Sequence, residues 1–109
     1  MNYLFSRAEE SKAVLLLMNG YKYSHEAMIE FNQATKKAQY LDAAIGLELA
    51  SKTFSECAEL TMSYLKSIDK SDSMESTFKK LYLVVDLIDE GAKKLLDKST
   101  EARKLADQS

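Results

Sequence analysis

Residues 74–106 read MESTFKKLYLVVDLIDEGAKKLLDKSTEARKLA. Apolar and small side chains recur in this segment at alternating steps of four and three, at Met74, Phe78, Leu81, Val85, Ile88, Ala92, Leu95, Ser99, Ala102 and Ala106. Strict spacing of about 3.5 residues is typical of a helix that packs along one side, as in a coiled coil. We therefore predict a long, coiled-coil-like C-terminal helix over residues 73–106, and we call these positions the seam.

The composition of the whole chain favours helix. Its 109 residues contain no proline and three glycines, so the chain lacks the residues that form the tight turns of a β-rich fold. Apolar residues make up 46% and charged residues 29%, which are ordinary values for a globular protein, and the length fits one domain. We predict an all-α fold, with a bundle of three or four helices in a single domain over residues 1–109.

The first predicted helix covers residues 2–19. It ends at Asn19-Gly20, because glycine readily adopts the left-handed conformation that closes a helix. Tyr21-Lys22-Tyr23 then forms a connection, and Ser24 caps the next helix. This interpretation places two tyrosines together in a loop, where a side chain with an apolar ring and a polar tip suits an interface.

The segment from Asn19 to Ala27, followed by Phe31 and Ala34, resembles the corner between the first two helices of MIT and tetratricopeptide modules. Those modules place a turn, an aromatic residue and an alanine at similar steps. The later helices continue neither pattern, so we infer no family membership.

Residues 24–67 allow two arrangements, because two apolar series are out of phase next to Gly46. We favour a hairpin of helices over 24–40 and 42–67, with a turn somewhere in Lys37–Asp42 and Asp42 as the cap. The alternative is one helix over 24–67, which would be about 70 Å long and too long to bury in a small monomer. A loop rich in serine and aspartate is predicted over Ser67–Ser73, with Asp72 capping the last helix.

The residues needed for common catalytic and metal sites are scarce. His25 is the only histidine and Cys57 the only cysteine, so neither a structural zinc site nor a di-iron bundle site can be assembled. Cys57 lies in an apolar series, where a free cysteine usually acts as a small buried hydrophobe. We predict no catalytic site, no metal and no cofactor, and we expect that the protein is not an enzyme.

Charge and hydropathy narrow the partners and the compartment. The net charge is −2 with acids and bases interspersed, unlike the basic surface that nucleic acid or an anionic membrane attracts. The longest strongly apolar run, Ala13–Met18, is too short to span a bilayer. A lone cysteine suits a reducing compartment. We expect a cytoplasmic protein that does not bind a membrane, and the charge distribution does not favour nucleic acid as its partner.

Two apolar surfaces remain as candidates for binding a partner. One is the first helix with its following tyrosines, and the other flanks the seam; together they comprise Leu16, Leu17, Tyr21, Tyr23, Val84 and Leu87. A single packed face would leave Val84 or Leu87 exposed, and exposed apolar patches usually mark a partner site. We expect a protein-binding protein, either an adaptor or a small secretion-type chaperone that shields a helical partner, and a homodimer is a further arrangement of the last helix.

The alternative function is a small dimeric regulator or antitoxin associated with nucleic acid. Its support is limited to the lysine pairs Lys79-Lys80 and Lys93-Lys94, which are two heptads apart and so share a face of the last helix.

Overall fold

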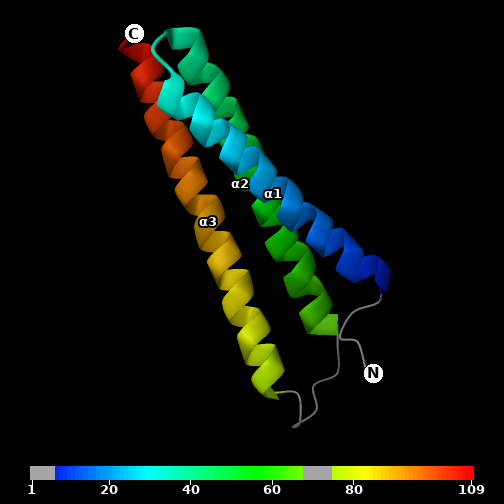
Figure 1. The fold of residues 1–109 in the computed structure, drawn as a ribbon. Coiled ribbons are helices and arrows are strands. Elements are labelled where there is room, and N and C mark those ends of the chain that lie inside the picture. The colour runs from blue at the N-terminus through cyan, green and yellow to red at the C-terminus, as the bar shows by residue number, and fades with distance from the viewer. Residues whose placement is uncertain (1–6, 68–74) are drawn as a thin grey trace.

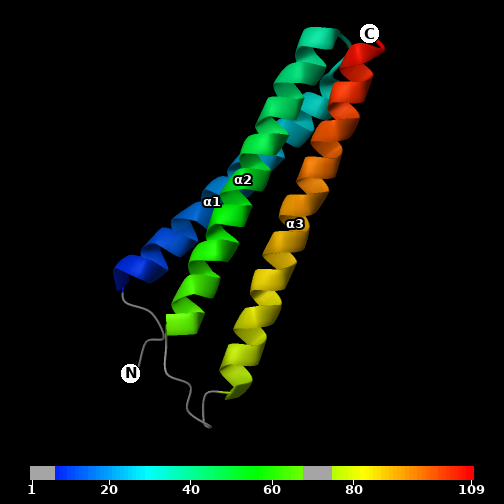
Figure 2. The same ribbon diagram turned by 180° about the vertical axis from the view of Figure 1, so that it is seen from behind.

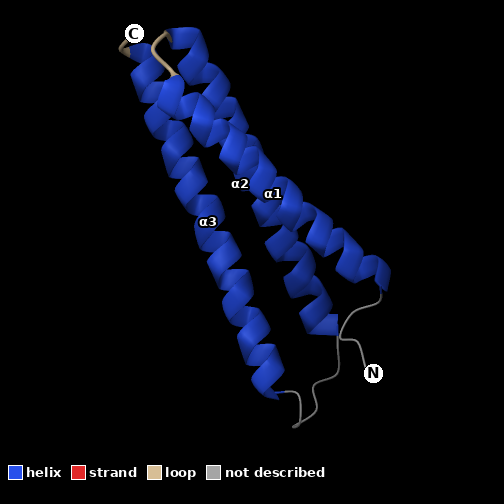
Figure 3. Cartoon of the chain, in the orientation of Figure 1, coloured by secondary structure: helices blue, strands red, loops and turns tan. Residues whose placement is uncertain are grey.

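The computed structural model describes residues 7–67 and 75–109, and in these ranges all regular structure is helical (Figure 3). The helices are α1 (Arg7–Gln33), α2 (Lys37–Ser67) and α3 (Glu75–Asp107). The all-α prediction is therefore confirmed for the described chain, with three helices there. Four predicted features lie outside the described residues. They are the helix start at residue 2, the body of the Ser67–Ser73 loop, its Asp72 cap and the seam position Met74.

Helix α2 is the centre of the arrangement. Figure 1 shows α1 and α3 lying along α2, and α1 and α3 approach each other at the end that holds the α1–α2 turn and the C-terminus. Toward their other ends α1 and α3 diverge, as the view from behind also shows (Figure 2). The molecule measures 56 × 21 × 17 Å, and its radius of gyration is 17.0 Å. A compact chain of this length would have about 13 Å, so the bundle is elongated.

The buried side chains form two clusters along α2. The first lies where all three helices meet, and joins Ala27 of α1, Ala44 and Leu47 of α2, and Ala102 of α3. The second lies between α2 and α3 alone, and contains Ala58, Leu65, Phe78 and Val85. Near this second cluster α1 has diverged from α3, so the core there has two helices rather than three.

Helix α1 passes through Gly20 without a break, so the predicted helix end at Asn19-Gly20 is wrong. A Cβ at Gly20 would lie 2.8 Å from ring carbons of Phe54, and one at Gly46 would lie 3.0 Å from the Cβ of Ala27. Both glycines therefore allow α1 and α2 to pack closely, and neither has a positive φ. Glycine ends a helix or lets another group approach closely, and Gly20 does the second.

The predicted connection at Tyr21-Lys22-Tyr23 and the cap at Ser24 are wrong for the same reason. All these residues lie within α1, and the Ser24 hydroxyl donates a hydrogen bond to the Tyr21 carbonyl at 2.9 Å. The predicted helices 2–19 and 24–40 are thus largely one helix. The corner that resembles MIT and tetratricopeptide modules is absent from the structure.

The turn between α1 and α2 lies at residues 34–36, ahead of the predicted range Lys37–Asp42. Gln39 stabilises it, because its Oε1 accepts hydrogen bonds from the backbone N–H of Thr35 at 2.8 Å and of Lys36 at 3.2 Å. This is the backward-reaching half of a capping box. Asp42 lies inside α2 and caps nothing, and the alternative of one helix over 24–67 is also wrong.

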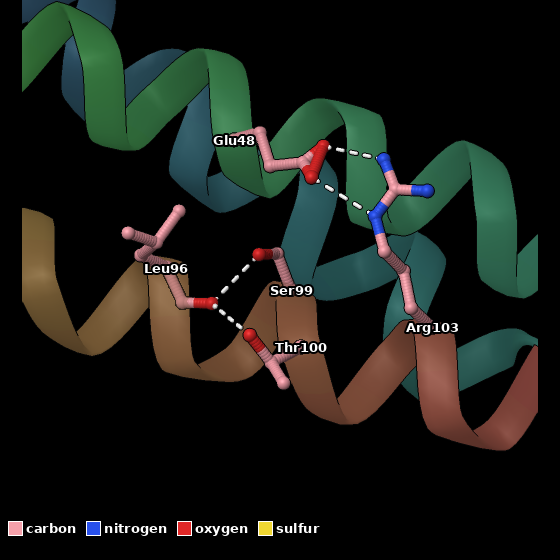
Figure 4. Close-up of polar contacts among 5 residues, drawn as sticks. All are labelled: Glu48, Leu96, Ser99, Thr100 and Arg103. Carbon is pink, nitrogen blue, oxygen red and sulfur yellow. Dashed lines mark hydrogen bonds and ion pairs between the residues drawn. The ribbon is translucent and has the colours of Figure 1, made fainter.

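The seam of α3 faces α2. Phe78, Val85, Ala92, Ser99, Ala102 and Ala106 are buried, and Leu81, Ile88 and Leu95 are half-buried. Two polar contacts fix the register of α3 on α2. The buried Ser51 hydroxyl donates to the Ala92 carbonyl at 2.7 Å. Arg103 donates to both carboxylate oxygens of Glu48, at 3.0 and 2.7 Å, as Figure 4 shows. The one-sided packing predicted for the last helix is confirmed.

None of the helices in residues 7–67 and 75–109 has the length and the apolar content that crossing a membrane requires.

Candidate partner-binding groove

An open apolar groove runs between α1 and α3, with α2 beneath it. Its volume is about 550 Å³. Phe54 of α2 is the one α2 side chain that lines it, and the rest of the lining comes from the two outer helices: Leu17, Tyr21, Ser24 and Met28 of α1, and Val84, Leu87, Ile88, Gly91, Lys94, Leu95 and Lys98 of α3. We call this feature the α1–α3 groove.

The α1 wall is one stripe of the helix. Leu17, Tyr21, Ser24 and Met28 follow one another at steps of four, three and four, which places them on one face. The Tyr21 ring meets the Phe54 ring edge to face, with centroids 5.3 Å apart, and Tyr21 is still 64% exposed. The hydroxyl of Ser24 is occupied by its bond within α1, so this wall presents a mainly apolar surface.

The α3 wall lies beside the seam. Val84 is 46% exposed and Leu87 is 67% exposed, whereas the adjacent Val85 is 4% exposed because it packs on α2. The inference that one packed face would leave Val84 or Leu87 exposed is therefore confirmed for both residues. The chain leaves large apolar side chains in contact with water on both walls of the same groove.

Among the described residues, the charged side chains that line the groove are both lysines, Lys94 and Lys98. Lys98 is already engaged: its Nζ lies 4.6 Å from the centroid of the Phe31 ring and 3.1 Å from a carboxylate oxygen of Glu101. Lys94 has no carboxylate of the described chain within ion-pair distance. The neighbouring Lys93 pairs with Asp89 at 3.6 Å. Of these two adjacent lysines, the one without an ion-pair partner in the described chain is Lys94, which lies at the groove.

Gly91 lies in the α3 wall between the apolar and the basic parts. A Cβ built on Gly91 would have nothing within 4 Å, unlike the Cβ at Gly20 or Gly46. Glycine inside a helix costs about 1 kcal/mol relative to alanine. Because an alanine at position 91 would fit without a clash, the packing of this chain does not explain why glycine is present there.

The structure brings together four of the six residues that the sequence singled out: Leu17, Tyr21, Val84 and Leu87. The other two lie elsewhere. Leu16 lines a separate depression between α1 and α2 with Lys12 and Leu60, and Tyr23 is half-buried and does not line the groove.

The groove also contains Phe54, Met28 and Leu95, which the sequence does not indicate as parts of one surface. The missing signal was the continuity of the stripe from Leu17 to Met28, which is visible in the sequence only if the helix continues through Gly20.

The chemistry-bearing side chains lie apart from the groove. His25 is exposed on α1, and Cys57 is buried with its thiol 3.4 Å from the carbonyl of Ala13. Burial raises the pKa of the Cys57 thiol, opposed by a hydrogen bond from Thr61. In the part of the chain that the structure describes, no group of His, Cys, Asp and Glu is arranged to hold a metal ion. That the protein is not an enzyme stays a prediction.

Comparisons of this chain with protein-family models, with curated proteins and with solved structures found no match.

Proposed function

We propose that this protein binds a helical segment of another protein in the α1–α3 groove, as an adaptor or a small chaperone that shields that segment in the cytoplasm. The observation that carries this proposal is the gathering of Leu17, Tyr21, Val84 and Leu87 in one groove, with Tyr21 and Leu87 mostly exposed.

The shape of the groove favours a helix as the occupant. Both walls are helices whose lining residues recur every three or four positions, and such walls interdigitate with the same spacing on a third helix. Amphipathic helices bind other proteins by laying their apolar face into a groove of this kind. An added helix would also cover the second cluster of the core on the side from which α1 has diverged.

Both walls of the groove expose apolar side chains whose burial would stabilise a complex. Burying apolar surface contributes about 25 cal/mol per Å², and an exposed leucine or tyrosine leaves that contribution unused. Three exposed side chains, Tyr21, Val84 and Leu87, converge with the half-buried Leu17 on a groove whose floor is the Phe54 ring. Scattered exposed leucines need no explanation, but a contiguous patch on opposed walls usually marks a binding site.

The alternative function, a dimeric regulator associated with nucleic acid, has weaker support. Its lysine pairs are on α3, where Asp86, Asp89 and Glu90 lie between them. The acids reduce the field that would attract phosphates.

Site-specific cross-linking tests the proposed function. A photoreactive amino acid replaces Leu87 in one variant and Leu96 in a matched control, both expressed in the native cell. Both leucines are exposed on α3, at 67% and 51%, but nine residues of helix place them on opposite sides. We expect the Leu87 position to cross-link a discrete partner protein and the Leu96 position to leave it unlabelled. Equal labelling at both positions, or none at the Leu87 position, contradicts the proposal.

A further inference from the structure

The charge of the α1–α3 groove is one-sided. Lys94 and Lys98 lie one turn apart on α3, and the groove lining contributed by residues 7–67 and 75–109 contains no carboxylate. Val84 and Leu87 precede them on the same wall, so one end of the α3 wall is apolar and the other combines the two lysines with Leu95. Since Lys98 is occupied by Phe31 and Glu101, the group left to meet an occupant is the Lys94 ammonium.

A buried ammonium is unfavourable unless an anion accompanies it. An occupant that covered Lys94 with apolar side chains alone would remove its hydration without compensation. An occupant with a carboxylate at that point would instead form a charge-assisted hydrogen bond, one of the stronger polar contacts in proteins. The groove therefore favours an apolar helix whose stripe has an acidic end.

A second copy of this groove would not supply that carboxylate. A twofold-symmetric interface brings the same surface from both subunits together. Whichever end of the groove lay at the axis, its described lining would present lysine, serine, tyrosine or apolar side chains to Lys94, and no acid. The charge pattern thus favours a different protein over self-association.

The closest approach of the occupant is set by Gly91. Small residues let two helix backbones come close together, and elsewhere in this chain the same device is visible where Gly20 meets Phe54 and Gly46 meets Ala27. At Gly91 the corresponding space is open. Gly91 also lies between the apolar part of the α3 wall and Lys94. An occupant that contacts both of these must therefore pass over Gly91.

We propose that the occupant of the α1–α3 groove is an amphipathic helix of another protein, which crosses α3 at Gly91 and places a carboxylate from the acidic end of its apolar stripe on Lys94. This inference rests on the proposed function, because it names the chemistry of the partner for the same groove.

Two designed peptides test this inference. Each has about 20 residues, because shorter isolated helices are marginal in water, and presents leucines at helical spacing on an alanine and glutamine background. One carries two glutamates, one turn apart, at one end of the leucine stripe, and the other carries lysines there. Fluorescence anisotropy with the full-length protein at low salt measures both affinities. We expect the acidic-end peptide to bind at least about threefold more tightly, the scale of a partly exposed ion pair.

Matched variants locate the effect. Lys94→Glu should reverse the preference, whereas Lys93→Glu, which changes the net charge equally but lies off the groove, should retain it. Gly91→Ala should weaken both peptides severalfold without lowering the melting temperature, because its new methyl group would meet only the occupant. Circular dichroism confirms that each variant is folded.

The outcomes separate the two proposals. If both peptides bind equally and Lys94→Glu changes neither, the acidic-end inference is wrong while the groove function stands. If neither peptide binds, both proposals fail. Sedimentation of the parent protein as a dimer that Leu87→Glu converts to a monomer would show that a second copy occupies the groove, and would overturn the inference.

Discussion

Gly20 and Gly91 show how one residue type has opposite consequences in two helices. In α1 a Cβ at position 20 would overlap the Phe54 ring at 2.8 Å, while in α3 a Cβ at position 91 would meet nothing within 4 Å. Overpacking typically costs about 1–3 kcal/mol, and replacing glycine by alanine inside a helix contributes about 1 kcal/mol. The space around each glycine therefore decides whether replacing it by alanine stabilises or destabilises the protein.

We expect Gly91→Ala to stabilise the protein by about 1 kcal/mol. We expect Gly20→Ala to destabilise it by up to about 2 kcal/mol, because the overlap with Phe54 outweighs the gain in helix propensity. Urea denaturation of both variants beside the parent measures the two effects. A stabilising Gly20→Ala would show that Phe54 can move aside at little cost, and that the close approach of α1 does not depend on this glycine.

Cys57 provides a pH-dependent contribution to stability. Its pKa is raised from the usual 9.0, chiefly by burial, so the folded state favours the neutral thiol. A raised pKa makes this contribution fully present below the unfolded value and progressively lost as the pH rises toward the folded value. We expect the free-energy difference between the parent and Cys57→Ala to shrink above about pH 9. Urea titrations at several pH values measure it, and a constant difference across that range would contradict the prediction.

The turn between α1 and α2 is the clearest feature at the scale of elements. It contains neither glycine nor proline, and it is fixed by one side chain, Gln39, which accepts from Thr35 and Lys36. Helix starts leave backbone N–H groups without partners, and Gln39 supplies an acceptor from inside α2. The close packing of Ala27 against Gly46 follows, because the hairpin brings α1 back along α2.

We expect Gln39→Ala to destabilise the protein by about 1 kcal/mol, the usual effect of losing a helix cap. Gln39→Glu should have little effect or stabilise slightly, because a carboxylate retains the acceptor and is favourable near a helix N-terminus. Thermal melting of both variants measures the difference. Equal losses in the two would show that the amide's packing matters rather than its acceptor oxygen.

The sequence predicts helix content and the buried side of α3 well, because these depend on periodicity within one element. It does not predict where α1 ends. Gly20 carries the usual signal of a helix end, and only the position of Phe54, more than thirty residues later, reveals its actual role. The sequence also does not predict the turn at residues 34–36. Its stabilising contact comes from Gln39, and glutamine is equally common inside a helix, so it gives no signal of a helix start.

The candidate site shows the same division. Val84 and Leu87 were identified from their place beside the seam, which is a property of α3 alone. That Leu17 and Tyr21 face them across a groove depends on how α1 and α3 are both placed on α2. The packing of the whole bundle decides which helices come into contact when they are not consecutive in the chain. The periodicity within α1 or α3 alone therefore cannot predict that they face each other.

At the scale of the whole molecule, α2 holds two outer helices that touch each other little. The elongated shape leaves the second core cluster covered by two helices, and the groove open beside it. Folding and binding consequently depend on adjacent but different faces of α3. Val84 and Val85 are consecutive residues of one type, and they lie on these two faces at 46% and 4% exposure.

This pair allows the two roles of α3 to be separated. We expect Val84→Asp to leave the melting temperature within a few degrees of the parent, because its carboxylate stays hydrated. It should weaken both designed peptides strongly, because it places a charged, hydrated group at the apolar end of the groove. Val85→Asp should destabilise the fold by at least about 4 kcal/mol, since it buries an unpaired carboxylate. Most small domains are stable by about 5–15 kcal/mol, so Val85→Asp should be close to unfolding. Melting curves and peptide anisotropy measured on both variants test this. If the two variants melt equally early, Val84 belongs to the core, and the α1–α3 groove is packing space within the chain rather than a binding surface.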